Sequence, residues 1–296
     1  MSPVEPPRRS CDRPAADPAG RLRGGQDRCP GTLRLHPADD GHLARVRVPG
    51  GRLTGQQLAE IASVATDLGD GALHLTSRGN LQVRGLPATA GQALADRLFH
   101  AGLLPSVERD RVRNVVASPL AGLDGTGCAD VEGVLADLDR LLCETPGLDR
   151  LSGRFLFAVD DGRGDMLGAG ADLSAVAEPG KGFRLWVGGR ASALSAPAAG
   201  AARLLVEAAA RFLACAEPTG AWRVAELDAP ERVAPLGASI APAATPAPGR
   251  PPLGTVTGTG ALCAVHVLPP LGSARAAQWA VLASLAGGPS AAPPRI

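Results

Sequence analysis

The order of hydrophobic periods between residues 43 and 108 constrains the fold of this chain more than any other feature. Three stretches alternate between apolar and polar residues, as half-buried strands do, and two others repeat with the helical period. A further short apolar run could add a strand. In chain order we expect a strand at 43–48, a helix from Thr54 to Gly69, strands at 72–76 and 80–85, a helix at 88–101 and a strand at 103–108. This β-α-β-β-α-β order predicts a ferredoxin-like module.

The first predicted helix carries signals at both ends. Thr54 offers a side-chain oxygen at the N-cap position, and Gln57 stands where it completes a capping box. Gly69 follows the last apolar residue of the period and is a typical C-terminal stop. We therefore expect a helix that begins after Thr54 and ends at Gly69.

The hairpin between the two central strands gathers many hydrogen-bond donors. Its sequence over 74–85 reads HLTSRGNLQVRG, with leucine and valine on one face and polar residues on the other. A solvent-facing hairpin normally closes with a simple Asn-Gly or Gly-Gly turn. The polar face and the turn hold His74, Thr76, Arg78, Asn80, Gln82 and Arg84. This set of donors indicates a face that binds anions, although His74 by itself is more simply a core-edge residue.

Residues beyond the module predict further α/β structure and the start of a second unit. We expect a helix at about 130–144, strands at 154–159, 169–176 and 182–189, a helix at 197–216, a strand within 261–270 and a helix at 273–286 with Ser273 as its cap. The last strand and helix form a lone β-α unit, which cannot bury its own faces. It should therefore pack on the first module or stay loosely ordered.

Composition and periodicity together divide the chain into five parts. The first is rich in Pro, Arg, Asp and Gly without any period, and the fourth is rich in Pro and Ala. The expected parts are a disordered tail at 1–27, a ferredoxin-like half-domain at 28–110, a central α/β domain at 111–227, a linker at 228–254 and a partial second half-domain at 255–296.

The composition and the hydropathy pattern argue against two classes of partner, nucleic acids and membranes. The net charge of +1, together with three Trp, five Phe and no Tyr, argues against a nucleic-acid binder. No run of uncharged apolar residues is long enough to span a membrane. Arg8 and Arg9 form a twin arginine, but no apolar export region follows them. We expect a cytoplasmic protein that binds neither nucleic acid nor membrane.

The cysteines and the clustered aspartates give no clear metal signature. Six cysteines are scattered without a CxxC pair, a poor match to zinc or iron–sulfur spacing. Asp160, Asp161 and Asp165 lie in the stretch DDGRGD, which is more typical of a polar turn than of a metal loop. We predict no metal ligands from these residues.

Four motifs in fixed order resemble the nitrite and sulfite reductase superfamily, and within it the precorrin-3B synthase branch. They are RCPGTLRLHPADDGHLARVRVPGGRLT, LHLTSRGNLQVRGL, RVRNVVASPLAG and LSGRFLFAVDDGRGD. The resemblance runs from about residue 28 to 190 and resumes at 260–286. It implies an α+β fold with one complete ferredoxin-like half-module, a central α/β domain and an incomplete second ferredoxin-like module.

The resemblance also implies an activity and cofactors. Precorrin-3B synthases hydroxylate precorrin-3A with oxygen and form a lactone during cobalamin (corrin) biosynthesis, whereas the reductases bind sirohaem and a [4Fe–4S] cluster. The family's cluster cysteines should follow residue 286, and this sequence does not contain them. We therefore expect a precorrin-3B synthase-like oxidoreductase that is impaired or that depends on a second polypeptide; the electron donor is unknown. The alternatives are a tetrapyrrole-binding module without redox chemistry and a sirohaem nitrite or sulfite reductase-like protein.

The motifs also indicate which residues would hold the tetrapyrrole. Arginine binds carboxylates through paired hydrogen bonds, and a polycarboxylated macrocycle needs several such contacts. Leu156 stands where the reductases carry a second lysine, which argues against a site for a small anion and makes sirohaem the less favoured ligand. No catalytic residue is assigned. By resemblance, the expected tetrapyrrole contacts are Arg78, Asn80, Gln82, Arg84, Arg113, Asn114 and Arg154.

Overall fold

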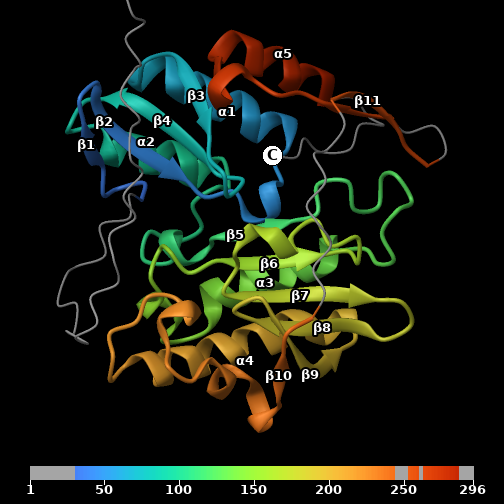
Figure 1. Cartoon of the computed structure of the whole chain (residues 1–296). Helices are drawn as coiled ribbons and strands as arrows, with labels where there is room; N and C mark the ends of the chain where they lie inside the picture. Colours follow the sequence, from blue (N-terminus) through green and yellow to red (C-terminus); the bar gives the residue numbers. More distant parts are fainter. Residues whose placement is uncertain (1–30, 244–252, 260–262, 287–296) are drawn as a thin grey trace, which may run out of the picture.

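The computed structural model describes residues 31–243, 253–259 and 263–286. The expected disordered tail at 1–27 lies outside the described residues, as does part of the expected linker. Figure 1 shows two layered units, with the ferredoxin-like module above and a second sheet with its helices below.

The module is a five-stranded sheet with helices on one face. Its first part runs β1 (His36–Ala38), β2 (Gly41–Val46), α1 (Gly55–Leu68), β3 (Ala72–Leu75), β4 (Leu81–Leu86) and α2 (Gly91–His100). The strand order is β1-β2-β4-β3-β13, where β13 is Ser273–Arg275, and all neighbours are antiparallel. The buried leucines and valines of β2, β3 and β4 form one core with α1 and α2. The opposite sheet face carries the polar residues of the hairpin.

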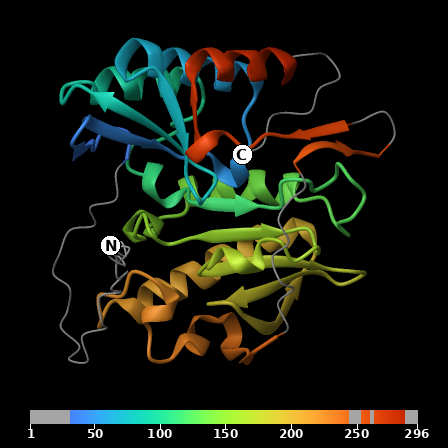
Figure 2. The same cartoon turned by 45° about the horizontal axis from the view of Figure 1, so that its top comes forward.

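The lower unit is a six-stranded mixed sheet with two helices on one face. Its elements are β5 (Val115–Ala117), α3 (Glu132–Glu144), β6 (Phe157–Asp160), β7 (Leu173–Glu178), β8 (Gly182–Val187), β9 (Arg190–Ala196), α4 (Ala198–Ala216) and β10 (Ile240–Ala241). Strands β5, β6 and β7 are parallel, and the remaining pairs are antiparallel. Figure 2 shows β5 nearest the module.

The C-terminal helix packs on the module, which is one of the two outcomes expected for the lone β-α unit, but the strand expected within 261–270 lies in a separate two-stranded sheet. A separate hairpin, β11 (Gly254–Thr257) and β12 (Cys263–His266), precedes β13 (Ser273–Arg275) and α5 (Ala276–Ala286). Strand β13 pairs with β3, and Trp279 of α5 is 6% exposed in the core that α1 also lines. In the upper part of Figures 1 and 2, α5 lies along α1.

The predicted strand at 103–108 is wrong, because the apolar run ends a helix instead. The amides of Leu103 and Leu104 both donate to Leu98 O, at 2.9 and 3.2 Å, after Gly102 has turned to a positive φ of 70°. Both leucines are buried, so they close the C-terminal turn of α2 by a hydrophobic contact. Strands β1 and β13 occupy the two edges of the sheet.

Two further expectations differ from the structure. Ser273 lies in β13 and does not cap a helix; the helix begins at Ala276, and Arg275 N donates to Gln278 Oε1 at 2.9 Å. Within the expected linker, residues 230–241 form short 3-10 turns and β10, and Val233 and Ala234 are fully buried. The prolines there begin tight turns over α4, so a high proline content did not mean an unpacked segment.

Candidate functional site

The module and the lower sheet meet through three buried polar side chains. Arg47, Asn80 and Asn114 are each at most 1% exposed. Asn114 Oδ1 accepts from Arg47 Nη1 at 3.2 Å and from Asn80 Nδ2 at 3.1 Å. Asn80 and Asn114 are the two asparagines of the whole sequence, and they bond to each other. Below, these three side chains are called the junction network.

Backbone groups complete the junction network. Asn114 Nδ2 donates to Phe155 O at 3.0 Å, and Arg47 Nη2 donates to Gly153 O at 3.2 Å. Asn80 Oδ1 accepts from Val48 N at 3.1 Å. Because buried polar groups are costly unless they are bonded, this network fixes one arrangement of the two units. It brings together segments from all four sequence motifs.

The tight turn before β4 sends its residues in two directions. Thr76 Oγ1 accepts from Asn80 N at 3.1 Å. Gly79 adopts a φ of 62°, a backbone conformation that would be strained for a residue with a side chain. Asn80 then points into the junction network, while Arg78 lies half-buried at its rim. Arg78 Nη1 donates to Arg154 O at 3.1 Å. The turn therefore places the predicted Arg78 beside the predicted Arg154.

Arg154 extends over an aromatic ring. Its side chain is exposed, and its guanidinium carbon lies 4.8 Å from the ring centroid of Trp222. Arg78 and Arg154 come from the module and the lower unit, respectively, and together form a cationic rim.

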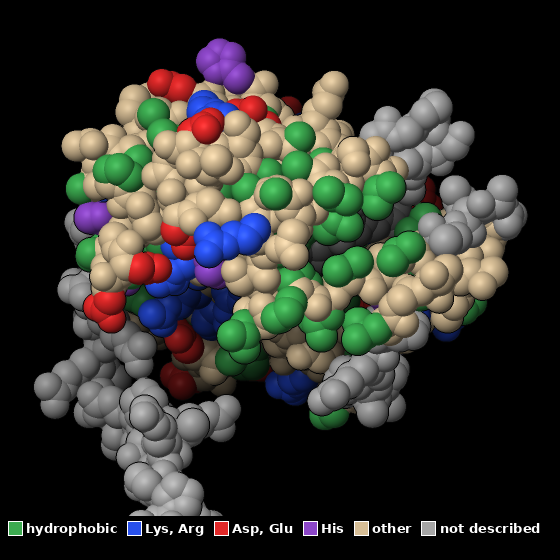
Figure 3. Space-filling view, turned by 90° about the horizontal axis from the view of Figure 1, so that it is seen from above, with side chains coloured by type: hydrophobic (Ala, Val, Ile, Leu, Met, Phe, Trp, Pro, Cys, Tyr) green, Lys and Arg blue, Asp and Glu red, His purple; other side chains and the backbone are tan. Residues whose placement is uncertain are grey.

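The open face of the module sheet continues from this rim. Cross-strand register places Arg45, Gln82, His74 and Ser273 in one row over β2, β4, β3 and β13. Among the described residues, buried Arg45 Nε and His74 Nε2 have no hydrogen-bond partner. Asp70 Oδ2 lies 3.7 Å from His74 Nε2, outside hydrogen-bond distance. Seen from above, most of the basic, acidic and histidine side chains lie on the left of the view, and hydrophobic side chains are more frequent toward its right (Figure 3).

Two predicted contacts are already held by carboxylates. Arg84 makes paired bonds to Asp40 at 2.8 and 2.9 Å, which hold the pKa of Asp40 below its usual range. Arg113 is 4% exposed, pairs with Asp139 at 2.7 and 2.8 Å and donates to Leu103 O. Arg113 thus ties α3 to the end of α2 and does not reach the rim.

The structure therefore groups only part of the predicted set. Arg78, Asn80, Asn114 and Arg154 meet at the junction, and Gln82 lies on the adjoining open face. The sequence reasoning missed Arg47 and Arg45 as site residues. The alternation over 43–48, which puts both arginines on one strand face, was the signal that could have found them.

The clustered aspartates and the described cysteines do not point to a cysteine-bound metal centre. Asp160, Asp161 and Asp165 come within 4.8 Å of one another, but they accept from loop amides, Arg163 and Ser118, as a polar turn does. The free cysteines that are described, Cys128, Cys143 and Cys215, lie in a loop, in α3 and in α4. Within the described ranges, no group of three metal-ligating side chains includes a cysteine, so these residues do not fit a cysteine-bound cluster.

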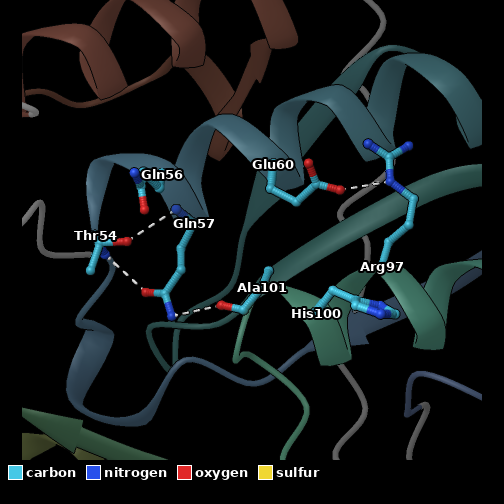
Figure 4. Close-up of a pocket in the computed structure, with 7 residues that line it drawn as sticks. All are labelled: Thr54, Gln56, Gln57, Glu60, Arg97, His100 and Ala101. Carbon is cyan, nitrogen blue, oxygen red and sulfur yellow. Dashed lines mark hydrogen bonds and ion pairs between the residues drawn. The ribbon is translucent and has the colours of Figure 1, made fainter.

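A polar hollow between α1 and α2 is explained by helix capping. Figure 4 shows Thr54 and Gln57 facing each other there, with Gln57 also reaching Ala101. Gln57 N donates to Thr54 Oγ1 at 3.1 Å and Thr54 N donates to Gln57 Oε1 at 2.9 Å, which confirms the predicted capping box. Glu60 and Arg97 form an ion pair across the same hollow.

Thr54→Ala should lower the free energy of unfolding by about 1 kcal/mol, because it leaves an N-terminal amide of α1 without its acceptor. Urea denaturation at constant slope measures the change. The exposed neighbour Gln56, which lies outside the box, supplies the control Gln56→Ala. Equal stability of the two variants would contradict a stabilising box.

No helix in the described ranges is both long and apolar enough to cross a membrane.

Comparisons with known proteins agree with the module. Residues 36–99 match the family model of the nitrite/sulfite reductase ferredoxin-like half domain. A ferredoxin–nitrite reductase of Synechococcus elongatus is 37% identical over 158 residues, covering 50% of this chain and 31% of the relative. A precorrin-3B synthase of Sinorhizobium is 29% identical over 161 residues, covering 54% of this chain and 34% of the relative. The chain thus spans about a third of the length of these curated relatives.

The solved structure of the Mycobacterium tuberculosis NirA protein has a similar fold. Its TM-score is 0.63 at 20% identity, over 83% of this chain and 50% of that one. The structural similarity confirms the expected α+β fold. The family model and the curated relatives confirm the expected relation to nitrite and sulfite reductases.

Proposed function

We propose, from the premise that residues 36–99 are a nitrite/sulfite reductase ferredoxin-like half domain, that this chain binds a polycarboxylated tetrapyrrole at the junction of its two units. The observation that carries the proposal is the meeting of Arg78 and Arg154 beside an open sheet face. Two buried nitrogens on that face, Arg45 Nε and His74 Nε2, have no hydrogen-bond partner among the described residues, although Asp70 Oδ2 lies 3.7 Å from His74 Nε2.

The chemistry of this surface suits such a ligand. A guanidinium group binds a carboxylate in its own plane, through two parallel N–H groups. The carboxylates of the macrocycle project from its edge in several directions, so several donors are needed. The rim and the row containing Arg45, Gln82 and His74 offer donors from both units and from three strands. The junction network beneath them would position the donors without contacting the ligand.

The favoured ligand class is a precorrin-type tetrapyrrole, as in the precorrin-3B synthase-like oxidoreductases of cobalamin biosynthesis. Leu156 supports this choice, because a buried leucine, 1% exposed, follows Arg154 two positions later and supplies no second cation for a small anion. The second candidate is a nitrite reductase-like function with a ferredoxin donor. It is supported by the 37% identity to a ferredoxin–nitrite reductase.

The proposal assigns binding to this chain and derives no redox step. The described cysteine side chains do not form a ligand set for an iron–sulfur cluster. What the chain's own residues do is hold carboxylates at the rim and order the two units around the ligand.

Titration with iron-free uroporphyrin III, followed by absorbance, tests this function. We expect saturable binding that weakens as salt rises, because exposed charge pairs are screened. Protoporphyrin IX, which carries fewer carboxylates, is the matched ligand and should bind more weakly. Displacement of uroporphyrin by nitrite would favour the second candidate. A lack of saturable binding by the folded chain would contradict the proposal.

A further inference from the structure

One aromatic ring lies directly under a cation of the rim. Trp222 is half-buried in the loop after α4, and the Arg154 guanidinium carbon lies 4.8 Å from its centroid. A guanidinium that stacks on a ring keeps its in-plane N–H groups directed outward, where they can bind a carboxylate.

A single buried carboxylate holds the ring and the cation in register. Asp172, 1% exposed, accepts from Leu156 N at 2.9 Å and from Val224 N at 2.7 Å. These amides lie two residues after Arg154 and two residues after Trp222. Asp172 and these two amides, called the Asp172 clamp below, hold the two segments together at equal distances from Arg154 and Trp222. The side chains of Arg154 and Trp222 therefore face each other.

The residue between Trp222 and Val224 strengthens this clamp. Arg223 Nε donates to Asp172 Oδ2 at 2.6 Å, and Arg223 Nη2 donates to Gly170 O. Trp222 N itself donates to Glu226 Oε2 at 2.8 Å. Hydrogen bonds therefore fix the backbone of Trp222 and the neighbouring Arg223 side chain. The exposed Arg154 side chain thus packs against a ring whose position is fixed.

We propose that Trp222 is a positioning residue that holds the Arg154 guanidinium at the rim, ready for a ligand carboxylate. This inference rests on the proposed function. Without the ring, the exposed Arg154 side chain would sample many rotamers and would have to be ordered when the ligand binds. Trp222 would then act through Arg154 and would make no essential contact with the macrocycle itself.

The first test needs no ligand. In Trp222→Leu, the Arg154 Nε–H resonance should lose the ring-current shift that it has in the wild-type chain, while Trp222→Phe should retain part of it. Arg154→Gln identifies the resonance by removing it. An Arg154 resonance that is the same in the wild type and in Trp222→Leu would overturn the stacking on which the inference depends.

The second test is a double-mutant cycle with iron-free uroporphyrin III. Trp222→Leu should weaken binding by about two- to fivefold, the range for an exposed cation–π contact. The double variant with Arg154→Gln should bind no more weakly than Arg154→Gln alone, because the ring acts only through that arginine. Thermal unfolding of each variant serves as the folding control.

The possible results separate the inference from the function on which it rests. Wild-type binding that Trp222→Leu leaves unchanged would overturn the inference alone. So would fully additive losses, which would mean that the ring contacts the macrocycle directly. An absence of uroporphyrin binding by the wild-type chain would overturn the proposed function and this inference with it.

Discussion

Arg78→Ala should weaken the binding of iron-free uroporphyrin III by about 1.5–3 kcal/mol, or roughly 10- to 140-fold. The tight turn holds Arg78 at the rim, and its Nη1 is bonded to Arg154 O across the two units. Because the Arg78 side chain is already ordered, it loses little conformational entropy when a ligand binds. The substitution therefore removes nearly the full binding contribution of a charged donor. Absorbance titration of the two proteins at one fixed salt concentration measures the difference.

Two variants control this prediction. Arg78→Lys keeps the charge but not the planar fork, and should recover only part of the affinity. Arg140→Ala removes an exposed arginine of α3 that pairs with Asp137 and Glu144 on its own helix, and should bind as the wild type does. Equal affinity of Arg78→Ala and the wild type would remove Arg78 from the site.

Asn114→Ala should lower the free energy of unfolding by about 3 kcal/mol or more. The variant leaves Arg47 Nη1, Asn80 Nδ2 and Phe155 O without the partner they share, in a region that is closed to water. Each buried group that loses a hydrogen bond in this way costs about 1–3 kcal/mol. Urea denaturation, compared at equal slope, gives the loss.

The asparagine pair permits a sharper version of this experiment. Asn80→Ala should also destabilise the fold, but the double variant should lose clearly less than the sum of the two, since each change alone orphans the other side chain. Gln92→Ala, on the exposed face of α2, should stay within about 0.5 kcal/mol of the wild type. Strictly additive losses for the asparagines would mean that their bond does not couple the two units.

The sequence predicted the module well where periodicity and capping agree. The Thr54 box, the helix that it starts and the central hairpin all depend on neighbours within a few residues. The run at 103–108 failed because a short apolar run can serve as a strand or as the hydrophobic closure of a helix end. Periodicity alone does not distinguish these two uses.

The sequence named part of the candidate site, but it did not show how the side chains pair. The motifs named Asn80, Asn114, Arg78 and Arg154, and the structure joins them. Nothing local to Arg113 reveals that Asp139, on a helix 26 residues away, would hold it. Long-range ion pairs are set by how whole elements pack, so an arginine in a motif can be committed to the fold.

The most direct test of the junction as the binding site is hydrogen exchange of the whole chain with and without saturating uroporphyrin III. We predict slower exchange of backbone amides in the 76–82 turn and strand and in the 152–156 segment, with no change in α4. These two segments carry Arg78 and Arg154 and lie on either side of the junction. Protection confined to other segments, or none in a saturated sample, would contradict binding at the junction.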